Sequence, residues 1–153
     1  MSAKVIQAGV EDVGRLAPLF DAYRQFYRQP PDLDGAREFL TERLTRKESV
    51  VFLAVAEGAR EPAALGFVQL YPSFSSVKMR RIWVLNDLFV AREARRHGVA
   101  RLLMDAALDL ARTTGSARLA LATAKDNVPA RSLYLALGYH IDEEFDHLEL
   151  PVA

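Results

Sequence analysis

An apolar stretch near the middle of the chain, MRRIWVLNDLFVA at 79–91, places the strongest constraint on the fold. Its β-branched, aromatic and leucine side chains predict a long strand buried in the centre of a sheet. A helix is predicted directly after it at 98–115, and a further strand, ARLALAT, at 117–123. A strand–helix–strand unit of this kind favours parallel pairing of its two strands.

The rest of the chain predicts strands and helices in a less regular order. Apolar spacing, turn residues and capping residues predict strands at 4–9, 49–57, 64–74 and 139–151, and helices at 10–28, 36–47 and 127–138. A short turn between the second and third of these strands predicts an antiparallel hairpin. The order β-α-α-β-β-β-α-β-α-β predicts an α/β domain with a mixed, mostly antiparallel sheet and helices on both faces.

Length and composition are those of one globular domain over residues 1–153. Lys plus Arg and Asp plus Glu balance at 20 each, so we expect no nucleic-acid partner. The absence of cysteine excludes disulfides and a cysteine nucleophile. His140 and His147 would face opposite sides of a strand, so we expect no metal site. Without a signal-peptide core or a membrane-spanning apolar run, we expect a cytoplasmic protein that binds no membrane.

A basic segment with one glycine, AREARRHGVARLL at 91–103, lies between the central strand and the next helix. A helix N-terminus presents unpaired N–H groups and a partial positive charge, so it binds anions. Gly98 lets the backbone approach a phosphate closely, Ala100 keeps the first turn small, and Arg95 can reach the same phosphate. A solvated basic loop is the alternative. The segment is not a P-loop, because no Gly-Lys-Ser/Thr follows.

A second motif lies downstream, in KDNVPARSLYLALGY at 125–139. Asn127 is placed to begin a helix, Tyr134 lies two turns later, and a glycine ends the helix before the next strand. With the glycine turn and the order of elements, this motif resembles the GNAT superfamily of N-acetyltransferases. The resemblance covers essentially the whole chain, and its spacing is similar to that of the spermidine/spermine-type small-amine acetyltransferases.

The resemblance implies that acetyl-CoA is the co-substrate and that it enters a gap between two splayed parallel strands, at 79–91 and 117–123. Its pyrophosphate would lie on the glycine turn, its pantetheine arm beside the first of these strands, and its reacting end near the helix at 127–138. The residues implied for these contacts are Arg95, Arg96, His97, Gly98, Val99 and Ala100, then Leu88, Phe89 and Val90, then Asn127, Ala130, Arg131 and Tyr134. A backbone N–H near Phe89 would polarise the thioester carbonyl, as in an oxyanion hole.

Two residues are candidates for proton transfer. Tyr134 is implied as the general acid, because a phenol with a pKa near ~10 can protonate a thiolate with a pKa near ~8.5; packing in the apolar stripe of its helix is the alternative. Relatives in the small-amine subgroup often carry a Glu-Asp pair in the fourth strand, where this chain has Asn86-Asp87. Asn86 cannot be a base, whereas Asp87 can act as one directly or through a water, or can serve only to hold the substrate. It also fits a buried acid paired with Arg80 or Arg81, and a bulge is needed to bring both side chains to one face.

The acceptor amine is the ligand that the sequence constrains least. The family's first helices usually form the acceptor pocket, and we expect a small-molecule amine to contact Tyr27, Asp32, Trp83 and Asn86. The expected reaction is direct attack of a primary amine on the thioester in a ternary complex. The alternatives are acetylation of a protein lysine or N-terminus, and an acyl-CoA-binding regulatory domain without turnover. We also expect a homodimer.

Overall fold

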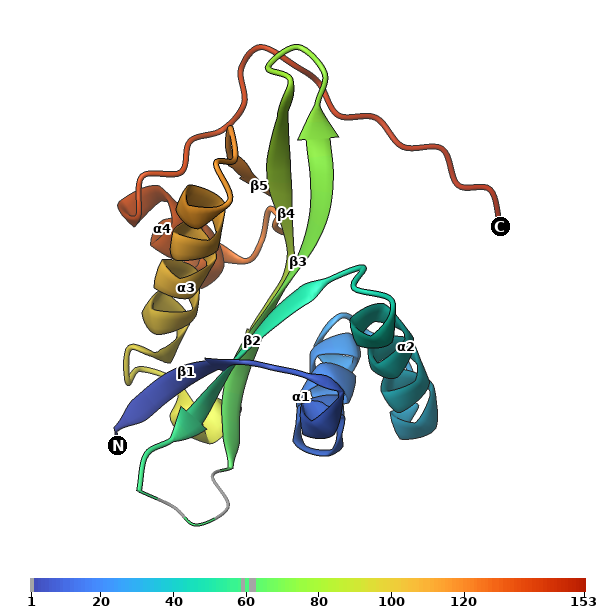
Figure 1. Cartoon of the computed structure of the whole chain (residues 1–153), viewed down its shortest axis with the longest axis vertical. Coiled ribbons are helices and arrows are strands. Elements are labelled where there is room, and N and C mark those ends of the chain that lie inside the picture. Colours follow the sequence, from blue (N-terminus) through green and yellow to red (C-terminus); the bar gives the residue numbers. More distant parts are fainter. Residues whose placement is uncertain (1, 59, 61–62) are drawn as a thin grey trace. The chain divides into compact units, whose positions relative to one another are not determined.

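The computed structural model describes residues 2–58, 60 and 63–153 (Figure 1). The chain forms two compact units that divide after Leu121. The first unit contains β1 (Ala3–Gln7), η1 (Val10–Asp12), α1 (Val13–Phe26), α2 (Leu33–Thr45), β2 (Val50–Ala56), β3 (Ala64–Ser75), β4 (Arg80–Val90), η2 (Arg92–Ala94), α3 (Val99–Thr113) and β5 (Leu119–Leu121). The second contains α4 (Val128–Ala136). The expected single domain over residues 1–153 stays a prediction.

The five strands form one mixed sheet in the order β1-β2-β3-β4-β5. The first four pair antiparallel with their neighbours, and β4 pairs parallel with β5. The predicted α/β architecture with a mostly antiparallel sheet is confirmed. Of the helices within the described ranges, none has the length and apolar composition needed to cross a membrane.

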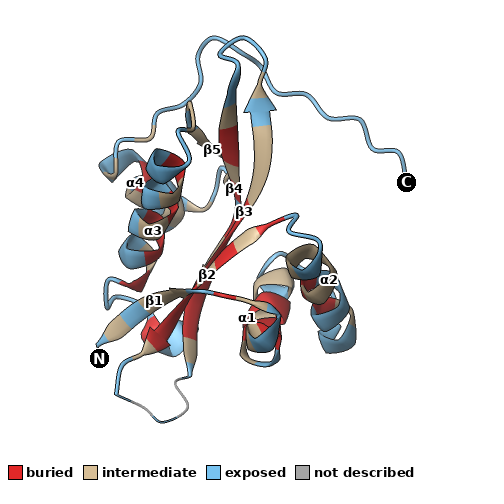
Figure 2. Cartoon of the chain, in the orientation of Figure 1, coloured by how far each residue is buried: buried red, intermediate tan, exposed pale blue. Residues whose placement is uncertain are grey.

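Helices cover both faces of the sheet (Figure 1). The Phe67 ring in β3 contacts the rings of Phe20 and Tyr23 in α1. The preceding residue, Gly66, faces Leu103 of α3, whose Cδ1 lies 3.3 Å from the position of a Cβ at Gly66. Since adjacent residues of a strand face opposite sides, α1 and α3 lie on opposite faces. Buried residues lie along the middle strands and on the inner sides of these helices (Figure 2).

The parallel pair is splayed, as the resemblance implied. β5 pairs with β4 only along Trp83–Leu85, although β4 continues to Val90. Beyond Leu85, no strand among the described residues pairs with this edge of β4. The fold therefore leaves an open strand edge next to the start of α3.

The helix α2 begins at Leu33, three residues before the predicted start. Its N-cap is Asp32, whose Oδ1 accepts a hydrogen bond of 2.9 Å from the Gly35 N–H. Such a cap satisfies one of the free N–H groups of the first turn and fixes where the helix starts. The sequence analysis predicted Asp32 as a contact of the acceptor amine and did not predict this capping role.

The strand expected at 139–151 is wrong, because the described residues there form no strand. Asp142 Oδ1 accepts hydrogen bonds from the N–H groups of Glu144, at 2.9 Å, and Phe145, at 3.1 Å, so the chain turns at this point. Pro151 also lacks the N–H that a central strand would donate. The apolar alternation predicted a strand, but the turn interrupts it.

We expect the substitution Gly66→Ala to destabilise the fold. An added Cβ would lie 2.8 Å from the Phe89 carbonyl oxygen and 3.2 Å from the Val90 Cα, so β3 and β4 would have to separate. Overpacking of this kind lowers the free energy of unfolding by about 1–3 kcal/mol, which urea unfolding measures.

Gly14→Ala is the matched control, because nothing lies within 4 Å of its added Cβ. Gly14 lies in the first turn of α1, so we expect this change to leave the stability unchanged or to raise it slightly. A Gly66→Ala protein as stable as wild type would show that the β3–β4 contact is not as tight as the structure indicates.

Candidate active site

A β-bulge in β4 brings two polar side chains to one face of the sheet. In the ladder with β3, Gln69 pairs with Asp87 and Leu70 with Leu85, so Asn86 is an extra residue. In a regular strand Asn86 and Asp87 would point to opposite faces. Across the bulge both line one pocket, and Asn86 Nδ2 donates a hydrogen bond of 3.0 Å to Asp87 Oδ1.

The Asp87 carboxylate is buried, at 5% exposure, and is hydrogen-bonded on both oxygens. Gln69 Nε2 donates to its Oδ2 at 2.8 Å. Among the described residues, no Lys or Arg lies within ion-pairing distance of Asp87. Arg81 instead lies over the rings of Phe74 and Trp83. The alternative of a buried pair with Arg80 or Arg81 therefore does not apply.

Burial perturbs the titration of two groups in this pocket. It raises the pKa of the Asp87 carboxyl above its ordinary value, while hydrogen bonds from Gln69, Tyr23 and Asn86 oppose the rise. Burial, followed by the nearby charge of Asp87, raises the pKa of Tyr71 to about 12, so this phenol stays protonated at neutral pH. A carboxylate with a raised pKa is a stronger base than an ordinary aspartate.

The pocket beside Asp87 has a volume of about 450 Å³ and lies among α1, α2 and the sheet. Aromatic side chains form much of its wall, namely those of Phe20, Tyr23, Tyr27, Phe39 and Tyr71. Phe20 stacks on Phe39 with ring centroids 5.7 Å apart, and Tyr23 meets Tyr27 edge to face at 5.1 Å. Aromatic faces and a carboxylate together attract a cation.

Three of the four residues expected at the acceptor line this pocket: Tyr27, Asp32 and Asn86. Trp83 does not. Its side chain is buried, and its Nε1 donates a hydrogen bond of 2.9 Å to Thr114 Oγ1 at the end of α3. Because α3 lies on the face opposite to α1, we leave Trp83 out of the acceptor site.

The wall formed by the loop between α1 and α2 is held in place by Asp21. This buried side chain accepts a hydrogen bond of 2.9 Å from the Asp32 N–H and pairs with Arg24 at 3.4 Å. Arg24 in turn donates to the Pro30 carbonyl at 3.2 Å. Asp32 therefore enters the pocket from a loop that is fixed at several points.

The segment between β4 and α3 passes through two left-handed residues, Arg96 with φ 66° and Gly98 with φ 76°. Gly98 is the N-cap of α3, and the Leu102 N–H donates the first hydrogen bond of the helix, of 3.2 Å, to the Gly98 carbonyl. The N–H groups that precede Leu102 in the first turn therefore have no acceptor within the helix. Left-handed residues also turn successive N–H groups towards one point, which forms an anion-binding nest. With Arg96, His97 and Gly98 exposed, this geometry fits a pyrophosphate.

Arg95 connects this turn to the end of β4. Its Nε donates a hydrogen bond of 3.1 Å to the Val90 carbonyl, and its guanidinium lies 5.6 Å from the centre of the Phe89 ring. The Ala91 N–H donates to Leu65 in β3, so alternation along the strand directs the Phe89 backbone groups towards β3. The open edge therefore presents the backbone groups of Leu88 and Val90. The backbone N–H that we expect near Phe89, to polarise the thioester carbonyl, therefore corresponds to the N–H of Leu88 or Val90.

The second unit contains the downstream motif. Asn127 caps α4, since its Oδ1 accepts a hydrogen bond of 3.3 Å from the Ala130 N–H. The Tyr134 and Tyr139 rings lie 6.0 Å apart, and the Tyr139 N–H donates to the Tyr134 carbonyl at 3.0 Å. The predicted helix start is confirmed. The ligand contacts of Asn127, Ala130, Arg131 and Tyr134 stay predictions.

Gln69 is the residue of this site that the sequence analysis missed. It is fully buried, and within the described residues its Oε1 has no hydrogen-bond partner. Its signal in the sequence is a single polar residue in an otherwise apolar strand, ALGFVQLY at 64–71. A buried polar side chain needs a partner, which in this fold is Asp87.

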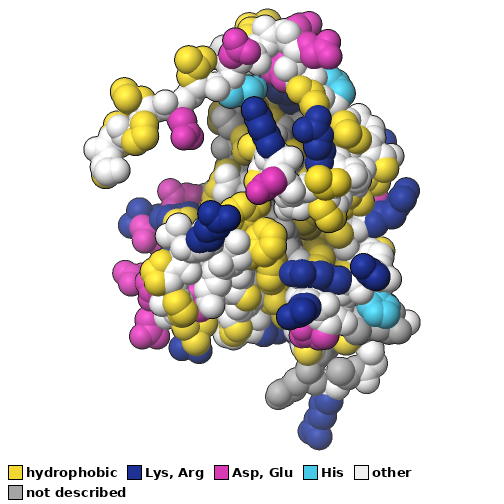
Figure 3. Space-filling view, turned by 180° about the vertical axis from the view of Figure 1, so that it is seen from behind, with side chains coloured by type: hydrophobic (Ala, Val, Ile, Leu, Met, Phe, Trp, Pro, Cys, Tyr) yellow, Lys and Arg dark blue, Asp and Glu magenta, His cyan; other side chains and the backbone are white. Residues whose placement is uncertain are grey.

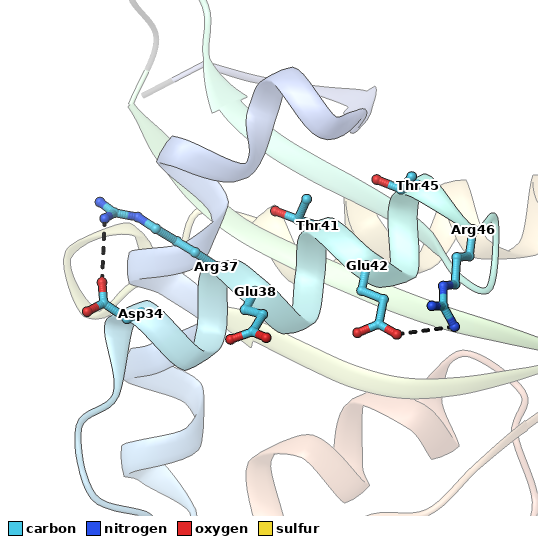
Figure 4. Close-up of a pocket in the computed structure, with 7 residues that line it drawn as sticks. All are labelled: Asp34, Arg37, Glu38, Thr41, Glu42, Thr45 and Arg46. Atoms are coloured by element: carbon cyan, nitrogen blue, oxygen red, sulfur yellow. Dashed lines mark ion pairs between the residues drawn. The ribbon is translucent and has the colours of Figure 1, made fainter.

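A second depression, of about 520 Å³, lies along the outer side of α2 (Figure 4). Its lining residues all come from α2 and the residue that caps its end, and several pair with one another, as in Arg37–Asp34 at 4.0 Å and Arg46–Glu42 at 3.3 Å. A depression lined by one helix, with four of its seven lining residues paired with one another, offers no converging set of groups for a ligand. We assign no site there.

Comparison with known proteins identifies the family to which this fold belongs. Residues 16–139 match the acetyltransferase (GNAT) family, and the chain belongs to that family. It is 48% identical over 146 residues to the uncharacterized N-acetyltransferase YhfO of Bacillus subtilis (strain 168), with 95% of each chain covered. The protein is an acetyl-CoA-dependent N-acetyltransferase, which confirms the family and the enzyme class expected from the resemblance.

Solved structures agree with this assignment. A crystal structure of a probable acetyltransferase is 45% identical and superposes with a TM-score of 0.93, covering 98% of both chains. The aminoglycoside N-acetyltransferase AAC(6')-Iy, solved in complex with CoA, is 20% identical with a TM-score of 0.79, covering 99% of this chain and 96% of the other. The second likeness shows a shared fold.

We expect the stability of the protein to depend on pH through Asp87. The raised pKa means that the folded state binds this proton more tightly than the unfolded chain, where the pKa is near ~3.9. As the pH rises from about 3.9 through the raised pKa, wild type should lose stability relative to Asp87→Asn. Urea unfolding of both proteins from about pH 4 to about pH 8 measures this difference.

Asp34→Asn is the control, because it removes a carboxylate that is fully exposed on α2. It corrects for the general effect of one lost negative charge. A stability difference between wild type and Asp87→Asn that does not change with pH would contradict the raised pKa.

Proposed function

We propose that the protein transfers the acetyl group of acetyl-CoA to a primary amine of a small cationic molecule. The observation that carries this proposal is the buried Asp87 carboxylate, which faces an aromatic pocket and has neutral hydrogen-bond donors as its partners. A buried charge without a counter-ion is costly, and a cationic ligand in the pocket would offset that cost. A volume of about 450 Å³ suits a small molecule.

Asp87 acts as the general base in this proposal. An alkyl ammonium has a pKa near ~10.4 and must lose a proton before its nitrogen can attack a thioester. The Asp87 carboxylate accepts that proton directly or through one water. Tyr27 and Asp32 position the rest of the cationic molecule, and Asn86 fixes the orientation of the carboxylate through its 3.0 Å hydrogen bond.

Gln69 supports both protonation states of this base. With Asp87 ionised, its Nε2 donates to the carboxylate, as the structure shows. After Asp87 has taken the proton, a half-turn of the amide presents Oε1, which can accept from the new O–H. An amide is suited to this position because it offers a donor and an acceptor on one side chain.

Acetyl-CoA supplies the acetyl group through its thioester. The turn formed by Arg95, Arg96, His97, Gly98, Val99 and Ala100 would hold its pyrophosphate, and the open edge at Leu88 and Val90 offers backbone groups to its pantetheine arm. An N–H on this edge would hydrogen-bond the thioester oxygen as negative charge develops there. Tyr134 donates a proton to the departing thiolate. Transfer is direct in a ternary complex, because the chain has no cysteine to carry the acetyl group.

Release of CoA thiol from acetyl-CoA, measured across polyamines, amino acids, aminoglycosides and lysine peptides, tests the proposed function. The chain contributes no thiol of its own to a thiol-reactive dye. We expect turnover with a cationic small amine, and a loss of roughly 10²–10⁴-fold in kcat for Asp87→Asn, the range for general base catalysis. Asp34→Asn should keep the wild-type rate. Binding of CoA without turnover of any amine would exclude the proposed function.

We expect Tyr134→Phe to lower kcat by roughly 10²-fold while the KM for acetyl-CoA stays near wild type, because the lost hydroxyl acts in proton transfer. Tyr139→Phe is the matched control, since its ring packs against Tyr134 in the same unit and the variant loses the same atom. Equal rates for the two variants would remove Tyr134 from the role of general acid.

A further inference from the structure

We propose that Tyr71 binds the reacting amine together with Asp87, so that the pocket selects a nitrogen that carries at least two N–H groups. The phenol oxygen of Tyr71 accepts one N–H of the ammonium, and the carboxylate of Asp87 accepts another. This inference rests on the proposed function, because it concerns the amine that the proposed reaction consumes. It deepens that function by naming the residue that selects the class of amine.

The sheet places Tyr71 on the same face as Asp87. Gln69 and Tyr71 are two residues apart in β3, so their side chains point to one face. Gln69 pairs with Asp87 in the ladder, and its Nε2 donates to the carboxylate at 2.8 Å. Tyr71 is therefore a diagonal neighbour of Asp87, at a separation that aromatic side chains can span. Both residues line the aromatic pocket.

The hydroxyl of Tyr71 is available to a ligand. The hydroxyl of Tyr23, the other phenol near the carboxylate, is engaged, because it donates to Asp87 and to the Asn86 carbonyl, the latter at 3.4 Å. By contrast, no residue in the described ranges is hydrogen-bonded to the hydroxyl of Tyr71. A partly buried hydroxyl without a partner gains stability from a ligand that supplies one.

Exposure distinguishes a buried end of the pocket from an open end. Asp87 is 5% exposed and Tyr71 is half-buried. Tyr27, in contrast, is 42% exposed, and Asp32 is exposed as well. The reacting nitrogen therefore lies at the buried end, between the carboxylate and the phenol. The rest of the acceptor molecule extends towards Tyr27 and Asp32.

The Tyr71 phenol can hold an ammonium group but cannot deprotonate it. Burial, followed by the charge of Asp87, raises the pKa of Tyr71 to about 12, so the phenol stays neutral at pH 7. A neutral phenol oxygen keeps lone pairs that accept an N–H. Tyr71 thus orients the nitrogen and leaves the transfer of the proton to Asp87.

The charge of the whole chain does not make this selection. Lys plus Arg and Asp plus Glu balance at 20 each, and side chains of both signs lie on the face drawn in Figure 3. A formal net charge of zero gives little long-range attraction for a cation. Discrimination between amines therefore depends on the groups inside the pocket.

Two ammonium probes of equal charge test the role of Tyr71. Benzylammonium has three N–H donors, whereas N,N-dimethylbenzylammonium has one, which Asp87 alone can accept. Calorimetric titration of each probe into the full chain, without acetyl-CoA, gives the two dissociation constants and their ratio. We expect wild type to bind benzylammonium more tightly. Tyr71→Phe should reduce that preference by roughly 10-fold, because it removes a hydrogen bond to a charged group.

The ratio separates a specific hydrogen bond from a structural role. The bulk of the two methyl groups affects wild type and Tyr71→Phe alike, so the change in preference reports on the phenol oxygen. Tyr139→Phe loses the same atom in the second unit and should keep the wild-type preference. Circular dichroism checks that each variant is folded.

Three results would overturn the inference: a wild type that binds neither probe, a wild type without a preference, or a preference that Tyr71→Phe retains. Each of these is distinct from a failure of the proposed function. That function is tested by the release of CoA thiol, whereas the binding of the probes is measured without any turnover.

Discussion

The bulge at Asn86 is the constraint on which the rest of the site depends. One extra residue in β4 turns Asp87 and Asn86 to the same face as α1 and shifts the register of the strand by one position. Without it, Asn86 and Asp87 would alternate, and the carboxylate would lose its 3.0 Å hydrogen bond from the neighbouring amide. The tight contact of Gly66 with the end of β4 then holds the following residues against β3. β4 is thereby fixed on one edge and open on the other.

This asymmetry of β4 separates two chemical environments along a single strand. On the α1 face, the carboxylate and aromatic rings form a pocket suited to a cation. Along the open edge, Leu88 and Val90 present backbone groups and lead to the left-handed turn at Arg96 and Gly98. An anionic and a cationic ligand can thus approach the same strand from different sides. Rigid strand pairing, rather than flexible loops, sets the spacing between them.

The order of strands and α-helices up to α4, and the starts of α3 and α4, could be predicted from the sequence, because apolar periodicity, Gly98 and Asn127 are local signals. The bulge could be anticipated only through the family resemblance, since one inserted residue leaves no mark on composition. Trp83 was expected at the acceptor site because aromatic rings attract cations. Side chains alternate between the two faces of β4, however, and the Trp83 side chain lies on the face of α3, where it bonds Thr114. Gln69 was missed because a polar residue in a strand does not reveal its partner. The strand expected at 139–151 failed because apolar alternation does not reveal that Asp142 turns the chain within the segment.

Burial of Asp87 has a consequence for the energetics of proton transfer. In water, moving a proton from an ammonium with a pKa near ~10.4 to a carboxylate near ~3.9 costs about 9 kcal/mol, at 1.36 kcal/mol for each pKa unit. Burial raises the carboxyl pKa, as it does for Asp87, and the same low-polarity pocket lowers the pKa of an ammonium that enters it. Both shifts reduce the difference between the pKa of the ammonium and that of the carboxyl group. The hydrogen bonds from Gln69, Tyr23 and Asn86 oppose the rise of the Asp87 pKa and favour the ionised carboxylate. In the proposed mechanism, the balance between burial and these three donors therefore sets how readily the amine is deprotonated.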